Sequence, residues 1–283
     1  MRVQARDRGL LVPDFVHVLN YDRLRDFIER VPPPWVFKPR SEAGAIGIKK
    51  VGSADELWKW LETLGDQQSF FVLERYVPGR VYHVDSIVSE REVVFSIASG
   101  YWLPPMDVSH GGGIFTTSVL PRENEDTQAL LELNRELLAA LGMVRGINHV
   151  EFIKGDDGHL YFLECAARVG GANIAEMVDY ASGVNLWDEW AHIEVANARG
   201  EDYTGPTPKD GFAGILQCLS QQEWPDLSAY NDPEAVWKLH KKNHAGLIVA
   251  SPSHDRVIEL LHQYRARFVQ DFLAVLPPRD KPE

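Results

Sequence analysis

The spacing of apolar and polar residues predicts helices and strands intermixed along the chain. Apolar residues three and four positions apart are typical of amphipathic helices, and short apolar runs between turn residues are typical of strands. A capping box, Ser53 with Glu56 three residues later, marks the start of one helix. The clearest helices are expected at residues 21–31, 53–65, 124–142 and 254–273. Strands are expected near 69–77, within hairpins at 81–102 and 146–171, and near 212–219 and 246–252.

The segment GINHVEFIKGDDGHLYFLECAARVGG (146–171) contains two glutamates that a hairpin would bring together. Asp157-Gly158 predicts a two-residue type I′ turn, which places Glu151 directly opposite Glu164. Directly paired residues share one face of a sheet with Cβ atoms about 4.5–5.5 Å apart. Two carboxylates beside apolar neighbours persist most easily around a cation or a shared proton, and oxygen ligands suit Mg²⁺. A solvated outer face is the alternative, and a longer loop would shift the register.

Arg168 follows this hairpin and precedes Gly170-Gly171. A guanidinium group four residues past a metal-binding carboxylate could hold a phosphate or a carboxylate through two hydrogen bonds. The glycine pair permits close approach of the backbone to a ligand, or it merely precedes the next helix. The pair alone does not separate these two interpretations.

Composition limits the class of protein. The chain has 283 residues, 45% of them hydrophobic, which supports one large domain or two smaller ones. A formal net charge of −12 argues against a nucleic-acid partner. The only cysteines, Cys165 and Cys218, do not suggest a disulfide framework, so a reducing compartment fits better. No apolar run approaches the roughly 20 residues of a membrane span, and the first residues do not form a secretory signal. We expect a cytoplasmic protein without a membrane partner.

Three segments in order resemble the ATP-grasp enzymes. VFKPRSEAGAIGIKKV (36–51) is similar to their phosphate-binding strand and loop, FVLERYVPGRVYHVDS (71–86) to the segment that joins their lobes around adenine, and the hairpin to their metal-binding end. The similarity spans roughly residues 10–200 and is nearest to carboxylate–amine ligases, which also resemble biotin carboxylase.

The resemblance implies an α+β fold of the ATP-grasp type. Two α+β lobes would hold ATP between them, followed by a C-terminal α/β tail. The expected parts are residues 1–75 with the small lid lobe, 76–204 with the large lobe and the metal hairpin, and 205–283 as an extension packed on the large lobe.

Site residues follow from the same resemblance. Lys38 would contact the ATP phosphates, and the loop around Gly44 and Gly47 would close over them. Glu74 would bind the adenine amino group or neighbouring polar atoms. The backbone of Tyr76 and Val77 would pair with the adenine edge. Glu151 and Glu164 would hold Mg²⁺, which Mn²⁺ could replace, and Arg168 would act in catalysis on the phosphoryl group. From the residues alone, each position also fits an ordinary structural role: a solvated lysine, a surface turn, or the end of a strand.

The implied reaction is ATP-dependent ligation in two steps. A small carboxylate would attack the γ-phosphate to give an acyl phosphate, and an amine or another nucleophile would then displace phosphate. Positioning and charge neutralisation would suffice without a nucleophilic side chain. A nucleotide-binding module without catalysis is the second hypothesis, and a structural interaction protein is the third. The substrates and the oligomeric state, including a homodimer, are left open.

Several departures from the family pattern support the second hypothesis. Ala166 stands where the family has a metal-binding asparagine, and His149, opposite it, would partly fill that space. Val81 stands where relatives bind ribose with a glutamate, so His83, or Asp85 near it, would have to make that contact. The abrupt start suggests that an N-terminal domain is missing, together with a second lysine or arginine for the phosphates. Residues 101–117 are expected to form a loop that lines the substrate site or, equally, an ordinary surface loop.

Overall fold

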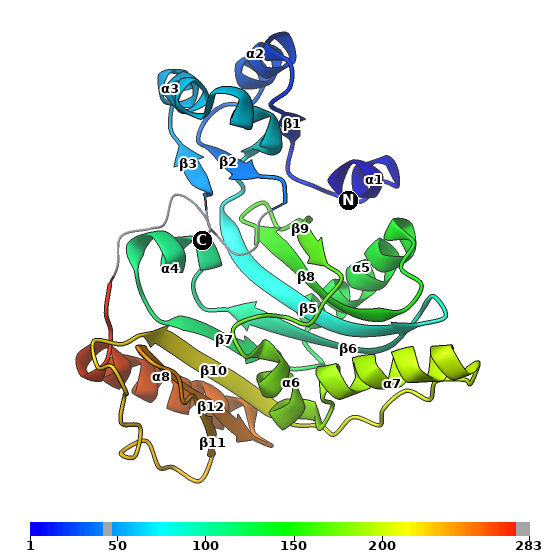
Figure 1. The fold of residues 1–283 in the computed structure, drawn as a ribbon, viewed down its shortest axis with the longest axis vertical. Helices are drawn as coiled ribbons and strands as arrows, with labels where there is room; N and C mark the ends of the chain where they lie inside the picture. Colours follow the sequence, from blue (N-terminus) through cyan, green and yellow to red (C-terminus); the bar gives the residue numbers. More distant parts are fainter. Residues whose placement is uncertain (42–46, 276–283) are drawn as a thin grey trace.

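Two antiparallel sheets form the framework of the protein in a computed structural model, which describes residues 1–41 and 47–275 (Figure 1). The smaller sheet has the strand order β1-β4-β2-β3, and the larger sheet the order β11-β12-β10-β7-β6-β5-β8-β9. The smaller sheet consists of β1 (Phe15–His17), β2 (Trp35–Pro39), β3 (Lys49–Val51) and β4 (Phe71–Arg75). The larger sheet consists of β5 (Gly79–Ser89), β6 (Glu92–Tyr101), β7 (Phe115–Val119), β8 (Gly146–Gly155), β9 (Leu160–Ala166), β10 (Phe212–Leu219), β11 (Ala235–Lys238) and β12 (His244–Ser251).

Helices cover both faces of the larger sheet and one face of the smaller one. On the larger sheet, α5 and α8 pack on one face, whereas α6 and α7 pack on the other. The short helix α1 also packs on this part of the protein, against α5 and β9. The described helices are α1 (Arg2–Asp7), α2 (Tyr21–Arg30), α3 (Ala54–Leu64), α4 (Pro105–Gly111), α5 (Glu125–Leu141), α6 (Ile174–Ser182), α7 (Leu186–Arg199) and α8 (His254–Asp271), with a 3-10 helix at Gly65–Phe70.

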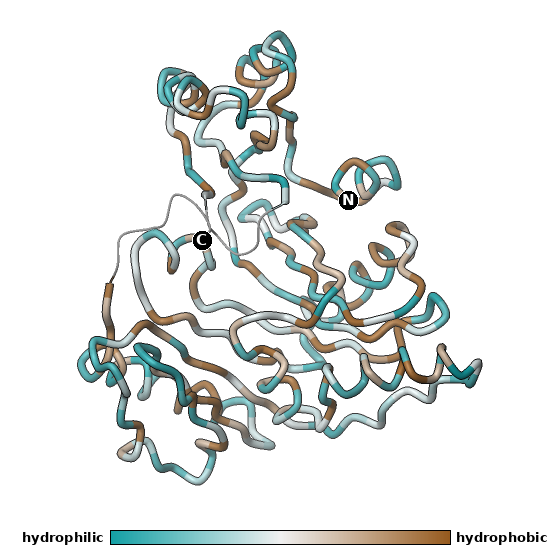
Figure 2. Tube along the Cα trace, in the orientation of Figure 1, coloured by the Kyte–Doolittle hydropathy of each residue, from teal (hydrophilic) through white to brown (hydrophobic). Residues whose placement is uncertain are grey.

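Strand alternation in the smaller sheet separates a core face from a polar face. Trp35 and Phe37 of β2 are buried in a cluster with α2 and α3, whose apolar stripes alternate with polar residues in Figure 2. Val36 and Lys38, the intervening residues, point to the opposite face. The predicted Ser53 cap of α3 is confirmed, because its side chain accepts a hydrogen bond from the Glu56 backbone N–H, while the Glu56 side chain accepts from the Gly52 backbone N–H at 2.8 Å. This lobe therefore presents one polar sheet face toward the larger sheet.

Alternation along the central strand β5 likewise directs successive side chains to the two opposite faces of the larger sheet. Val84 and Val88 pack under α5, and the opposite face bears His83, Asp85 and Ile87. Ile87 joins the core beneath α6 and α7, while His83 and Asp85 are buried polar residues farther along the strand. One strand thus runs from a hydrophobic core into a polar interior.

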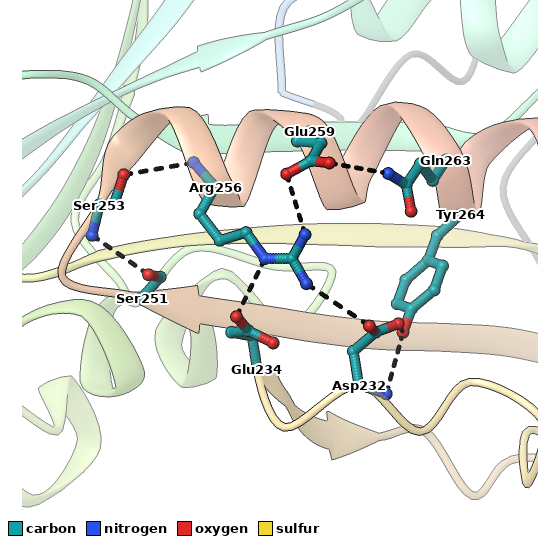
Figure 3. Close-up of polar contacts among 8 residues, drawn as sticks. All are labelled: Asp232, Glu234, Ser251, Ser253, Arg256, Glu259, Gln263 and Tyr264. Atoms are coloured by element: carbon teal, nitrogen blue, oxygen red, sulfur yellow. Dashed lines mark hydrogen bonds and ion pairs between the residues drawn. The ribbon is translucent and has the colours of Figure 1, made fainter.

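The C-terminal strands continue the larger sheet, because β10 pairs with both β7 and β12. Helix α8 covers them, and Arg256 in its first turn joins it to the segment before β11 (Figure 3). The guanidinium group donates to Glu234 at 2.9 Å and to Glu259 at 2.9 Å, and it lies 3.5 Å from Asp232. Tyr264 also donates a hydrogen bond to Asp232. A polar network therefore fixes this end of the sheet.

Replacing Arg256 by glutamine is expected to lower the free energy of unfolding modestly, since a surface ion-pair network contributes more than an isolated pair but remains partly solvated. Urea denaturation at low and high salt would measure the loss, which should shrink as salt screens the wild-type network. Arg199→Gln, on the exposed last turn of α7, is the matched control and should change stability little. A salt-independent loss would contradict this account.

Most predicted elements are confirmed, but residues 101–117 differ from the expected loop. They contain α4 and most of the buried strand β7. Strand β11 was also not predicted. Within the described part of the chain, no helix is long and apolar enough to cross a membrane.

Candidate functional site

A pocket lies where the polar face of the smaller sheet meets the larger sheet. Its walls are largely apolar, with Val36, Ile48, Val81, Ile153 and Leu163 among them. The residues predicted from the sequence that line it are Lys38, Glu74, Tyr76, Val77, Glu151 and Glu164. Helix α4, where a loop was expected, closes the pocket with Pro104, Pro105, Met106 and Asp107. The pocket thus combines largely apolar walls with several charged groups.

Four predicted residues do not line this pocket: Arg168, Gly44 and Gly47, and also His83, which is buried in the larger sheet. Arg168 lines an adjoining cavity that shares Lys38 and Glu164 with the pocket, and its guanidinium group donates to the Val169 carbonyl at 2.7 Å. Gly47 has a φ of +72°, in the left-handed region that favours glycine, and directly precedes Ile48. Gly44 lies outside the described residues.

Glu74 connects three elements at the charged end of the pocket. Its carboxylate lies 2.5 Å from the Arg2 guanidinium group and 3.3 Å from the Lys38 ammonium group. Arg2 also donates to the Leu163 carbonyl on β9. Burial lowers the pKa of Lys38, although the adjacent Glu74 opposes that shift. The sequence predicted no second cation from this end of the chain, but the first turn of α1 supplies one.

The predicted pairing of Glu151 with Glu164 is confirmed, although the predicted turn is wrong. Gly158 donates to the Gly155 carbonyl at 2.8 Å and has a φ of +82°, so the loop is one residue longer than the type I′ turn. Phe152 therefore pairs with Phe162 instead of Leu163. A β-bulge at Leu163 then restores the register, which brings Glu151 opposite Glu164. The bulge also leaves both Leu163 and Glu164 facing the pocket.

Buried polar residues from β5, β7 and β8 support Glu151. Asp85 accepts from His83 Nδ1 at 2.7 Å and from His149 Nδ1 at 2.9 Å, and His149 Nε2 lies 3.6 Å from Glu151 Oε1. The other nitrogen of His83 lies 2.8 Å from the Thr117 hydroxyl. His83 is fully buried, and both its ring nitrogens are engaged, so its position does not support the predicted ribose contact. His149 does lie opposite Ala166, as predicted.

The two histidines in this network differ in charge. Burial disfavours the charged form of both, but Asp85 and Glu151 raise the pKa of His149 to about 10. Burial dominates at His83 and lowers its pKa. Asp85 stays ionised: despite burial, the two histidines hold its pKa well below its usual range. A cationic imidazole therefore faces Glu151.

Glu151 and Glu164 have opposite electrostatic surroundings. Burial would raise the pKa of Glu151, but His149 and the Tyr101 hydroxyl, which donates to Glu151 at 2.8 Å, lower it. Desolvation of the carboxyl group, reinforced by the charge of Glu151, raises the pKa of Glu164, although its side chain stays open to the cavity. A carboxylate with a raised pKa next to an anchored one is a donor pair that fits a hard divalent cation.

Comparison with known proteins now identifies the family. A family model described as the ATP-grasp domain matches residues 31–176. The chain belongs to the ATP-grasp family. The match includes strands β2 and β4 and the β8–β9 hairpin, which belong to the segments that the resemblance in sequence singled out.

Relatives of this ATP-grasp chain are ligases by name. An L-arginine-specific L-amino acid ligase of Bacillus subtilis is 25% identical over 259 residues, which cover 84% of this chain and 60% of that protein. A D-alanine–D-alanine ligase of Bacillus anthracis is 28% identical over 133 residues, or 47% of this chain and 40% of the relative. The chain therefore spans less than two thirds of the length of these relatives.

Solved structures share the fold. A carboxyaminoimidazole ribonucleotide synthase from Aspergillus clavatus, complexed with ATP, superposes with a TM-score of 0.74 at 16% identity, over 95% of this chain and 72% of that one. An L-amino acid ligase from Bacillus licheniformis superposes with a TM-score of 0.70 at 17% identity, over 97% and 71% of the two chains. The predicted ATP-grasp architecture is confirmed.

A glycine at the junction of the two lobes gives a stability prediction. A Cβ at Gly79, whose φ is +154°, would lie 2.0 Å from the Lys154 carbonyl oxygen, so Gly79→Ala must displace the β5–β8 pairing. We expect a loss of about 1–3 kcal/mol, measured by urea denaturation. Gly158→Ala is the control on the same hairpin, since nothing lies within 4 Å of its added Cβ and only its positive φ costs about 1 kcal/mol. Equal losses for the two variants would contradict the steric argument.

Proposed function

We propose that this chain carries the nucleotide and metal site of an ATP-dependent ligase that activates a carboxylate as an acyl phosphate for attack by an amine. The observation that carries the proposal is the convergence of Lys38, Glu74, Glu151 and Glu164 on one pocket with apolar walls. Family membership and the names of the relatives support the same reaction class. Because the chain spans only part of those relatives, the complete activity is part of the proposal.

The proposed ATP position follows from the distribution of charge in the pocket. The adenine would lie against Val36, Ile48 and Ile153, near the backbone of Tyr76 and Val77, while Lys38 and Arg168 would bind the phosphates. The loop containing Gly44 and Gly47 would cover them. Mg²⁺, or Mn²⁺, held by Glu151 and Glu164 would offset the negative charge of the phosphate chain. Glu74 would act by holding Arg2 and Lys38 in place.

The proposed reaction has two balanced steps. A carboxylate oxygen attacks the γ-phosphorus, the bond to the bridging oxygen breaks, and ADP leaves with the electron pair. An amine nitrogen then attacks the acyl carbon, the carbon–oxygen bond breaks, inorganic phosphate leaves, and the amine loses a proton. Lys38 and Arg168 would hold the charged oxygens, and α4 with the apolar walls would exclude water from the acyl phosphate.

One observation favours an ATP-binding module without catalysis. Ala166 provides no side-chain oxygen ligand, and His149, which lies opposite, directs Nδ1 to Asp85, while the neighbouring Asp85 and Glu151 carboxylates raise its pKa to about 10 and so disfavour the neutral form that binds metals. The proposed metal site thus has two carboxylates, with no third ligand from His149 in this state.

Phosphate release separates the hypotheses. The full chain would be incubated with Mg·ATP, pools of amino acids and hydroxylamine, which traps acyl phosphates as hydroxamates. Release that depends on both the acid and the chain supports ligation, whereas ATP binding without release across the pools supports the module. Thermal denaturation measures binding, since ATP at 100 times its Kd should stabilise the protein by about 2.7 kcal/mol. No shift in denaturation temperature would contradict both hypotheses.

A further inference from the structure

A second cavity lies on the other side of Lys38 and Glu164 from the nucleotide pocket. It has a volume of about 590 Å³ and is bounded by α1, β1, the end of β2 and the strand β9. Because Lys38, Ile48 and Glu164 line both spaces, a ligand in this cavity would lie next to the proposed phosphate position. Its volume is sufficient for a small organic acid.

The titratable side chains around this cavity are mostly cationic, which is unusual for a chain with a net charge of −12. Glu164 is the carboxylate among the described residues that line it, and it lies at the end shared with the nucleotide pocket. We call this space the basic cavity and define it by its cationic residues and one histidine: Arg2, His17, Lys38, Arg40 and Arg168.

The cations of the basic cavity fall into two groups. Arg2 and Lys38 share Glu74, which offsets part of their charge. Arg40 and Arg168 form no ion pair with a carboxylate among residues 1–41 and 47–275. Lys38 and Arg168 line the cavity together with Glu164, whereas Arg40 lies two residues beyond Lys38 and close enough to His17 of β1 to lower its pKa. The cavity therefore offers positive charge beside Glu164 and again beside Arg40.

The positive field extends beyond Arg40. Burial lowers the pKa of His17, and the charges of Arg40, Arg6 and the N-terminal amino group lower it further. An adjoining cavity of about 580 Å³ shares Phe15 and His17 with the basic cavity, and the described residues in its wall include Arg6, Arg23 and Arg30 with Asp26 as the acidic residue among them. A ligand beside His17 thus meets a region that favours negative charge.

We propose that the basic cavity binds the acid substrate, and that this acid carries a second anionic group, held by Arg40 beside His17. The inference rests on the proposed ligase function. The reacting carboxylate would lie beside Lys38 and Arg168, and the second anion, a carboxylate or a phosphate, would pair with Arg40. A cationic side chain such as that of arginine would be repelled there, so this chain differs in substrate class from the relative named as arginine-specific.

Direct binding to the full chain tests this inference independently of turnover. Isothermal titration would compare glutarate with butyrate, and O-phospho-L-serine with L-serine, at low ionic strength. We expect each dianion to bind at least about 10-fold more tightly than its monoanionic or neutral counterpart. Arg40→Gln should remove most of that difference, while Arg199→Gln, on the exposed end of α7, should preserve it. If neither dianion is preferred, or if Arg40→Gln has no effect, the inference is overturned.

Turnover then separates this inference from the proposed function. With Mg·ATP and hydroxylamine, L-glutamate or O-phospho-L-serine should give hydroxamate with a kcat/KM at least about 10-fold above those of L-glutamine and L-arginine. Preference for L-glutamine or L-arginine would overturn the inference while leaving the ligase function intact. Arg40-dependent dianion binding without hydroxamate would instead overturn the ligase function.

Discussion

Glu164→Gln is expected to reduce Mg²⁺-dependent phosphate release about 100-fold or more, while the fold stays intact. The substitution keeps the size of the side chain but removes one of the two charges proposed to hold the cation. In the metal-free protein the same change should raise the denaturation temperature slightly. The charge of Glu151 helps to raise the pKa of Glu164, so the ionised Glu164 is destabilising and its neutral replacement is not.

Measuring both activity and stability of Glu164→Gln distinguishes loss of metal binding from loss of the fold. Activity would be measured over a range of Mg²⁺ concentrations, and stability by thermal denaturation in EDTA. Glu136→Gln, on the exposed face of α5, is the control and should change neither quantity. Near-normal turnover in Glu164→Gln would refute the metal-site assignment. A large drop in denaturation temperature would show that Glu164 has a structural role instead.

Asp85→Asn is expected to cost about 3–5 kcal/mol in stability, the typical loss when one partner of a buried charge pair is removed. The carboxylate is fully buried and accepts hydrogen bonds from His83 and His149 at once. An asparagine of the same shape cannot neutralise the cationic His149. Urea denaturation in EDTA would measure the loss, and Asp22→Asn, which removes a solvent-exposed ion pair with Arg25, should cost less than about 1 kcal/mol.

The difference between wild type and Asp85→Asn should depend on pH. The raised pKa of His149, about 10 in the folded protein, means that its stabilising pairing is fully present below the ordinary histidine pKa of about 6.5. That stabilisation is lost as pH rises through 10, so the difference between the two proteins should be larger at pH 6 than at pH 10. A constant difference would show that Asp85 acts only through its uncharged contacts.

Local periodicity predicted the helices and strands whose sequence pattern lies entirely within the element itself. The helices at 21–31 and 124–142 and the Ser53 cap depend on nearby residues, and the structure confirms them. Helix α4 was missed because Pro104-Pro105 at its start and the glycines at its end are typical of a loop, although Pro105 suits the first turn of a helix. Strand β7 was missed because Thr116, Thr117 and Ser118 are polar, yet they are buried in the larger sheet.

The candidate site was predictable only where its residues are close in sequence. Glu151 and Glu164 belong to one hairpin, so a local turn argument brought them together, even though two compensating irregularities were needed. Arg2 reaches the site through the placement of α1, which no local pattern determines. The buried network around Asp85 joins β5, β7 and β8, so only tertiary structure could reveal it.

Because of strand β10, the part of the chain that must fold together is longer than the part that matches the family model. The family match ends at residue 176, but β10 lies between β7 and β12, and its residues share a core with α6. A chain shortened to residue 204 would expose the hydrogen-bonding edge of β7 and the apolar underside of α6. Such an edge invites pairing between copies, so the shortened chain should aggregate. Dissection of this protein into a minimal catalytic module therefore has to retain its last strands.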